Sequence, residues 1–204
     1  MKGLPVSFGA PRPERADAAR NRVHLLATAR QMLAESGPDQ LTMDALAERS
    51  GLGKGTVFRR FGTRAGIFQA LLDEIERGLQ EEVLSGAPPL GPGAPPVDRL
   101  VAYGRARVRL LIENTEIFRC ALDGRQPVPS SPQTPASQMH VRMLLRQLSL
   151  DGADLDLLAI QLTAALDGPL LLYLSSDSLA SAGPQIEKSL GAAWQDLIER
   201  VCRP

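Results

Sequence analysis

Apolar residues recur every three or four positions along most of this chain, which is the spacing of amphipathic helices. A first stripe covers residues 17–36 and ends where Gly37 and Pro38 prevent a further turn. Further stripes cover residues 43–50, 54–61 and 63–85. Strict alternation and runs of β-branched residues are rare, so the pattern predicts an all-α protein.

Two stretches rich in proline, residues 86–98 and 125–137, interrupt this pattern and are predicted to be loops. Helices are predicted over the apolar stripes that remain, at residues 97–114, 115–122, 137–148, 155–174 and 184–201. The fourth of these helices is apolar on almost every side. It contains Gly168 and Pro169, which are expected to kink it.

Residues 42–61 carry small and large side chains at the positions that a helix-turn-helix requires. Thr42 is placed to cap the first helix with its hydroxyl, and Ala47 is small enough for the point where two helices cross. Gly51 supplies the positive φ of the tight turn. The inward face of the second helix is apolar and consists of Leu52, Val57 and Phe61. Its outward face is mostly polar and basic, with Lys54, Gly55, Thr56, Phe58, Arg59 and Arg60.

These breaks and motifs divide the chain into four predicted parts. Residues 1–16 hold Pro5, Pro11 and Pro13 and are expected to form a disordered arm that is not helical. The other parts are a helix-turn-helix domain at 17–62, a connecting helix at 63–85 and a second helical domain at 97–204.

The same motif resembles the DNA-binding domain of the TetR family of bacterial transcriptional regulators. The resemblance runs from about Arg22 to Leu72. It is carried by Leu41-Thr42, Leu46-Ala47, Gly51-Leu52, Gly55-Thr56-Val57-Phe58, Phe61 and Thr63-Arg64. Four positions depart from the family, which usually has Tyr at Phe58, often has His at Arg60, commonly has Ser or Thr at Gly53 and tends to have Lys at Arg64. The resemblance implies an all-α fold and a homodimer that binds a double-stranded DNA operator.

The residues expected to bind DNA are Thr42, Lys54, Gly55, Thr56, Phe58, Arg59, Arg60 and Arg64. Cations bind phosphates, a hydroxyl reaches a phosphate or a base edge, and a glycine lets the backbone approach closely. Plainer alternatives are that Thr42 only caps its helix, that Phe58 packs against the turn, and that Arg59 and Arg60 are merely solvated. The N-terminal arm either touches DNA through its basic residues or is a solvated tail.

The resemblance also implies a small-molecule effector pocket in the second domain. Its candidate residues are Tyr103, Arg107, Phe118, Met139, His140, Met143 and Tyr173. The alternative is that the methionines and Phe118 are plain core, and that His140, beside a loop, lies at the surface. Aromatic residues make up only 4% of the chain, which argues against a large aromatic cage.

The last two predicted helices carry more apolar surface than one chain of this size can cover. The resemblance implies that the same two helices of a second copy cover it in a four-helix interface. The residues expected there are Leu158, Leu162, Leu166, Leu190, Trp194, Leu197 and Ile198.

Charge is unevenly distributed along the 204 residues, although the formal net charge is zero. Residues 1–64 hold 11 Lys and Arg against 6 Asp and Glu, whereas the remainder holds 12 against 17. This asymmetry is typical of a DNA-binding domain joined to a different kind of domain.

Other features narrow the class of protein. There is no apolar run long enough to span a membrane and no secretory signal, and the two cysteines match no metal spacing, so a cytoplasmic protein without membrane partner, metal or cofactor is expected. No phosphate loop or nucleophile elbow is present, and His24 and His140 are the only histidines, so an enzyme is not expected. We therefore predict a repressor released from a palindromic operator by a small molecule. The alternative is a constitutive or activating regulator without an effector.

Overall fold

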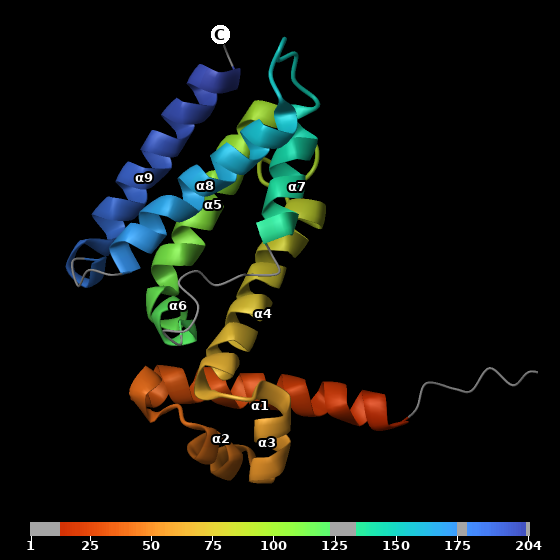
Figure 1. Ribbon diagram of the computed structural model, residues 1–204, viewed down its shortest axis with the longest axis vertical. Helices are drawn as coiled ribbons and strands as arrows, with labels where there is room; N and C mark the ends of the chain where they lie inside the picture. The colour runs from red at the N-terminus through yellow and green to blue at the C-terminus, as the bar shows by residue number, and fades with distance from the viewer. Residues whose placement is uncertain (1–12, 123–133, 175–178, 203–204) are drawn as a thin grey trace, which may run out of the picture. The chain divides into compact units, whose positions relative to one another are not determined.

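The computed structural model describes residues 13–122, 134–174 and 179–202, and over these ranges it contains helices and no strand (Figure 1). The predicted all-α class is confirmed. The chain forms two compact units, one ending at Ile67 and the other beginning at Phe68. The boundary lies inside helix α4, Arg64–Ser85, so this helix contributes residues to both units.

The N-terminal unit contains α1 (Pro13–Ser36), a short 3-10 helix η1 (Pro38–Gln40), α2 (Met43–Ser50) and α3 (Lys54–Phe61). Its interior is apolar, and the side chains without exposed surface are Leu25, Ala29, Leu41, Leu46, Val57 and Ile67. Helix α1 begins at Pro13, earlier than the predicted start at Asp17, because proline is well tolerated in the first turn of a helix. Residues 1–12 of the predicted arm lie outside the described residues.

Caps and turns fix the helix-turn-helix at the predicted positions. The Thr42 hydroxyl accepts a hydrogen bond from the backbone N–H of Ala45 at 3.1 Å and so caps α2. Gly51 ends α2 with φ 69°, a left-handed conformation that glycine adopts without steric cost. Thr63 caps α4 in the same way, by accepting from the N–H of Gly66 at 3.1 Å. The bounds of α2 and α3 therefore agree with those read from the sequence.

The C-terminal unit contains the rest of α4 and five further helices: α5 (Pro96–Glu113), α6 (Thr115–Ala121), α7 (Thr134–Leu145), α8 (Leu155–Leu174) and α9 (Leu179–Cys202). Helix α5 contacts α7, α8 and α9, and α8 crosses it (Figure 1). Helix α7 begins and ends earlier than predicted, and α9 begins before the predicted start at Pro184. Helix α8 continues through Pro169 as one helix.

A close approach of α5 and α9 is set by one glycine and one tryptophan. The buried Trp194 ring donates its Nε1–H to the carbonyl oxygen of Leu100 at 2.9 Å. A Cβ atom added at Gly104 would lie 2.0 Å from Trp194 Nε1, far inside van der Waals contact. Only glycine leaves room for the indole at this place.

The residues predicted for a dimer contact lie mainly inside their own unit. Leu162, Leu166, Trp194 and Ile198 are at most 4% exposed and belong to the core that α5, α7, α8 and α9 share. The other three, Leu158, Leu190 and Leu197, are half-buried against that core. The expectation for the first four is corrected, because a helix that is apolar all round must give one of its sides to its own core. The outward side of α8 carries Leu157 and Ile160 instead, 57% and 47% exposed.

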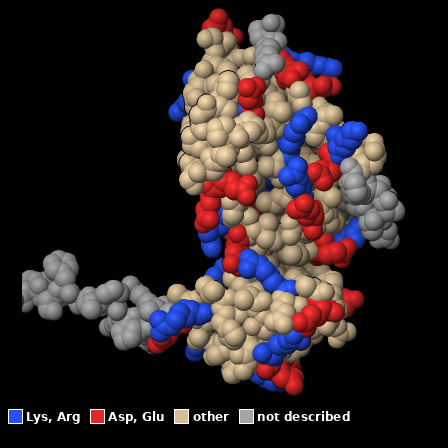
Figure 2. All heavy atoms as spheres, turned by 180° about the vertical axis from the view of Figure 1, so that it is seen from behind, with Lys and Arg blue, Asp and Glu red and all other residues tan. Residues whose placement is uncertain are grey.

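The surface of the C-terminal unit carries charges of both signs. Figure 2 shows basic and acidic side chains intermixed on one face of this unit rather than gathered by sign. Among the described helices, none combines the length and the apolar character needed to cross a bilayer. Within the described residues, no group of three or more His, Cys, Asp or Glu side chains is placed to hold a metal ion.

Candidate DNA-binding and ligand-binding sites

Helix α3 is held by its apolar side and presents its basic side to solvent. Val57 has no exposed surface and Phe61 is 9% exposed, so these two residues fix the helix against the rest of its unit. The opposite side carries Lys54, Gly55, Phe58, Arg59 and Arg60, all exposed, and the half-buried Thr56. The sequence-predicted residues of α3 are therefore all exposed except Thr56, which is half-buried. Phe58 is 48% exposed, so its ring does not pack fully against the turn.

Two cations of α3 make contacts within the unit. Lys54 Nζ lies 2.9 Å from Asp44 Oδ1, and both side chains are exposed. Arg60 Nη2 donates to the backbone carbonyl of Ala18 in α1 at 2.6 Å. Solvent screens such exposed pairs strongly, so DNA phosphates can compete for both side chains.

A polar hollow of about 380 Å³ lies between α1 and α3. Its wall consists of Asp17, Ala18, Asn21, Leu25, Thr56, Arg59 and Arg60. Arg20 pairs with Asp17, which reduces the repulsion that this carboxylate would exert on an anion. Two guanidinium groups and one hydroxyl thus converge on a space open to solvent, which is the donor set that a phosphate needs.

Arg64, which was expected to bind DNA, makes two hydrogen bonds inside its own unit. Its Nε donates to the carbonyl oxygen of Leu41 at 2.9 Å, and its Nη2 donates to that of Pro38 at 2.6 Å. The half-buried guanidinium therefore holds the segment that precedes α2 and positions the cap residue Thr42. Arg64 acts as a positioning residue in this arrangement, because its donors point to backbone carbonyls.

Sequence reasoning missed the contacts that brace α2 against α1. His24 Nε2 lies 3.0 Å from the carbonyl oxygen of Ser50, the last residue of α2. Arg49 pairs with Glu35 across the same two helices. Glu35 and Arg49 are oppositely charged residues near the ends of their helices, which is a signal in the sequence, but only the crossing of α1 and α2 makes them partners. The His24 contact has no such signal, because it uses the backbone carbonyl of Ser50.

The C-terminal unit contains a cavity of about 350 Å³. Its apolar wall is formed by Leu79, Val83, Leu84, Ala136, Met139 and Met143. Its polar wall is formed by Glu76, Gln80, Tyr103, Arg107, Ser137 and His140. Helices α4, α5 and α7 contribute these residues, and the volume lies in the range of small-molecule sites.

Five of the seven residues predicted for an effector pocket line this cavity, namely Tyr103, Arg107, Met139, His140 and Met143. Phe118 is 5% exposed and packs with Leu72, Leu110 and Leu111 in a separate cluster, so its expected place in the pocket is corrected. The side chain of Tyr173 lies outside the described residues. Met139 and Met143 are 58% and 41% exposed and therefore are not plain core.

The α4 residues of the cavity were not predicted. Glu76 offered a signal, because this carboxylate interrupts the apolar stripe that Leu72, Leu79 and Val83 continue. An acidic residue at such a position must find a partner when its helix packs.

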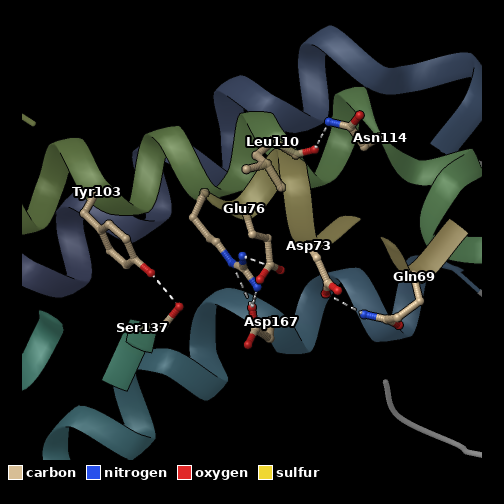
Figure 3. A network of polar contacts seen from close by, with 9 residues as sticks. Gln69, Asp73, Glu76, Tyr103, Leu110, Asn114, Ser137 and Asp167 are labelled. Atoms are coloured by element: carbon tan, nitrogen blue, oxygen red, sulfur yellow. Dashed lines mark hydrogen bonds and ion pairs between the residues drawn. The ribbon is translucent and has the colours of Figure 1, made fainter. Parts of the chain in front are cut away.

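Glu76 finds that partner in Arg107 of α5. Glu76 Oε1 lies 3.0 Å from Arg107 Nη1, and Asp167 Oδ1 of α8 lies 3.3 Å from Arg107 Nη2. Figure 3 shows the Glu76 and Asp167 carboxylates directed to the same place from α4 and α8. Burial alone would lower the pKa of Arg107, but the two carboxylates outweigh it and raise that pKa. Arg107 is therefore a charged residue with 6% of its surface exposed.

The remaining polar groups of the cavity are uncharged. The Tyr103 hydroxyl donates to Ser137 Oγ at 2.7 Å, and burial raises the pKa of Tyr103 although the Arg107 charge opposes this. Burial first, and the Arg99 charge second, lower the pKa of His140 to about 4. His140 packs its ring 4.9 Å from that of Tyr103 and is half-buried, which corrects the expectation of a surface histidine.

Sequence comparison identifies the N-terminal part of the chain. The pattern of the family described as "Bacterial regulatory proteins, tetR family" matches residues 25–71, which include α2 and α3. Among curated proteins, none matches the chain by sequence.

Comparison with solved structures finds the same fold over most of the chain. A TetR-family transcriptional regulator from Pectobacterium atrosepticum is similar with a TM-score of 0.69 and 20% identity, covering 93% of this chain and 98% of that one. A TetR-family regulator from a Rhodococcus species gives 0.60 and 18%, with 90% and 99% covered. NalD, the secondary repressor of a multidrug efflux pump in Pseudomonas aeruginosa, gives 0.54 and 16%, with 92% and 98% covered. At these identities the likeness concerns the fold.

Proposed function

We propose that this chain is a repressor of the TetR family of bacterial regulatory proteins, which binds a palindromic operator as a homodimer and is released by a small molecule. The regulators of this family are DNA-binding transcription factors and not enzymes. The observation that carries the proposal is the outward face of α3, where the cations are accessible because Val57 and Phe61 are buried on the other side. Because bacterial DNA lies in the cytoplasm, the proposal places the protein there.

In the proposed complex α3 enters the major groove. Arg59 and Arg60 contact phosphates or guanine, and Lys54 and Thr56 contact base edges or backbone. Gly55 lets the helix backbone approach the DNA. Phe58 and Thr42 add contacts at the edge of the interface, and the positive N-terminal end of the α2 dipole attracts a phosphate there.

The test begins with operators selected from a pool of random DNA duplexes by the purified protein. We expect Arg59→Ala to weaken binding to the selected operator and to reduce the slope of log affinity against log salt by about one for each phosphate that the variant no longer neutralises. The control is Arg146→Ala, which removes an exposed arginine of the C-terminal unit. An unchanged salt slope in Arg59→Ala would show that α3 does not face the phosphates.

A homodimer is proposed because one helix as short as α3 reads few base pairs, whereas a two-fold dimer presents two such helices to a palindrome. The exposed side of α8, with Leu157, Ile160 and Ala164, and the exposed Ala192 and Ala193 of α9 provide the surface for a second copy. We expect Ile160→Glu to convert dimers to monomers in light scattering, whereas Val23→Glu, at an exposed apolar residue of the N-terminal unit, keeps the mass of wild type.

Release by a ligand is proposed because the cavity takes much of its wall from α4, the helix that also supplies residues to the N-terminal unit. A ligand that changes α4 therefore acts on a helix that both units share. Moving such a protein from mostly bound to mostly free requires about 10⁴-fold preference of the ligand for one conformation. The cavity favours this interpretation over a constitutive regulator. A ligand that occupies the cavity without altering operator affinity would support the constitutive alternative.

A further inference from the structure

We infer that the cavity of the C-terminal unit takes an uncharged, mainly apolar molecule and selects against carboxylates and ammonium ions. The inference rests on the proposed function, since it assigns the chemistry of the ligand to the same cavity. It is drawn from three features of the wall: its apolar mouth, its closed charge network and its neutral polar groups.

The mouth of the cavity exposes apolar side chains to solvent. Leu84, Met139 and Met143 all line the cavity, and they are 72%, 58% and 41% exposed. Behind them Leu79 and Val83 continue the apolar wall. A ligand that covers these groups removes apolar surface from water, which stabilises the complex in proportion to the area covered. Methionine adds adaptable contacts, because its unbranched side chain fills irregular spaces.

Arg107, the cation among the described residues that line the cavity, is already paired. It contacts Glu76 and Asp167 at 3.0 and 3.3 Å, so two carboxylates face one guanidinium. A ligand carboxylate would lose its hydration and would have to displace one of these partners. An ammonium group would have to take Glu76 from Arg107. Either charge would therefore be desolvated without an unengaged partner of opposite sign, which is costly.

The remaining polar groups accept or donate hydrogen bonds without carrying a charge. Tyr103, Ser137 and His140 are neutral donors or acceptors, and the buried His140 Nε2 has no hydrogen-bond partner among the described residues. One uncharged polar group on an apolar ligand thus suits this end of the cavity.

The test compares three probes of equal length: 1-octanol, octanoate and octylamine, the last being an ammonium ion at neutral pH. Each probe is titrated into a mixture of the full-length protein and the neutral dye N-phenyl-1-naphthylamine without DNA, and the loss of dye fluorescence measures displacement. We expect octanol to bind at least tenfold more tightly than either ion. Equal or tighter binding of either ion, or no displacement by octanol, would overturn the inference.

Asp167 offers a way to change the charge without touching the wall, because it pairs with Arg107 but does not line the cavity. We expect Asp167→Asn to improve octanoate binding at least threefold while the affinity for octanol stays as in wild type, which also shows that the variant is folded. The matched control is Asp151→Asn, at an exposed turn residue, which should leave all three affinities unchanged. If octanoate gains nothing from Asp167→Asn, the charge network does not determine selectivity.

A second variant ties the dye signal to this cavity. Met143→Trp fills the mouth at a side chain that is 41% exposed and therefore has room for a larger group. We expect it to weaken octanol and dye binding together at least fivefold, and unchanged binding would place the dye elsewhere and overturn the assignment. The ligand proposal and the operator proposal can fail separately. If octanol does not bind more tightly than the two ions, operator binding can still hold. If the protein selects no operator, the order of the three probe affinities can still hold.

Discussion

Arg59 and Arg60 of the N-terminal unit and Arg107 of the C-terminal unit stand in similar sequence surroundings, on helices that alternate apolar and basic residues. The structure treats them in opposite ways. Arg59 and Arg60 are exposed on α3, whereas Arg107 is 6% exposed and is held by Glu76 and Asp167. The first kind of arginine serves an external anion, and the second kind ties together three helices of its own unit.

This difference shows what decides the role of a charge. On α3 the two guanidinium groups stay exposed, because Val57 and Phe61 are the residues that this helix buries in its unit. On α5 the neighbouring α4 and α8 each bring a carboxylate, so the charge is satisfied internally. Removing Arg107 should therefore lower the stability of the C-terminal unit, whereas removing Arg59 or Arg60 should weaken DNA binding by the N-terminal unit. The following variants test that contrast.

The largest effect is expected for Arg107→Leu. It removes the guanidinium that lies 3.0 Å from the buried carboxylate of Glu76, which is 3% exposed, and we expect a loss of about 3–5 kcal/mol in the free energy of unfolding. Urea unfolding followed by circular dichroism measures this loss. Adding Glu76→Leu to Arg107→Leu should restore much of the stability, since no buried charge then remains at that contact. A stable single variant would mean that the network does not hold α4 and α5 together.

Gly104→Ala tests the packing of the C-terminal unit without a change of charge. The added methyl group would meet the Trp194 indole, so we expect a loss of about 1–3 kcal/mol. Gly78→Ala is the matched control, because Gly78 is exposed in α4 and an added Cβ has nothing within 4 Å. That control should stabilise by up to about 1 kcal/mol through helix propensity. Opposite signs for the two variants would establish the close contact of α5 with α9.

The pH dependence of stability tests the buried site at His140. Its pKa is held at about 4, so between about pH 6.5 and 4 the unfolded chain binds a proton that the folded protein does not. The free energy of unfolding therefore falls as the pH drops through this window. We expect His140→Phe to remove about 1–2 kcal/mol of that fall, after allowance for solvent near a half-buried ring. His24→Phe, at the other histidine, should keep the fall contributed by His140.

Thr42→Ala removes the cap of α2 and should cost about 1 kcal/mol in the N-terminal unit. Thr42→Ser keeps the hydroxyl and should be close to wild type in stability. Thermal unfolding measures both. If Thr42→Ser also binds the operator as tightly as wild type, the hydroxyl is sufficient for both capping and DNA binding. If Thr42→Ala binds the operator more weakly but unfolds at the same temperature as wild type, the two roles are separate.

The smallest effect on stability is expected for the arginines of α3. Arg59→Ala should change the free energy of unfolding by less than about 0.5 kcal/mol, and Arg60→Ala by a similar amount despite its hydrogen bond to Ala18. Urea unfolding of both variants, beside Arg107→Leu, measures the contrast directly. A loss of several kcal/mol in either α3 variant would remove the distinction between outward and inward arginines.

The sequence allowed close prediction of the helix-turn-helix. Thr42, Gly51 and Phe61 mark the limits of α2 and α3 through capping, positive φ and helical spacing, all of which act within a few residues of the chain. Predictions were less accurate where several apolar sides compete. Leu162 and Trp194, expected at a contact between two copies, lie in the core of one unit, because periodicity cannot tell which apolar side faces inward.

The helical class, the turn at Gly51 and the resemblance of the N-terminal part to a known family could be read from the residues alone, since these depend on neighbours along the chain. The contacts of Arg107 with Glu76 and Asp167, the packing of His140 on Tyr103 and the cavity beside them emerge only when the helices pack together. These partners come from different helices, and whether a charge is buried or exposed is fixed by what packs against it.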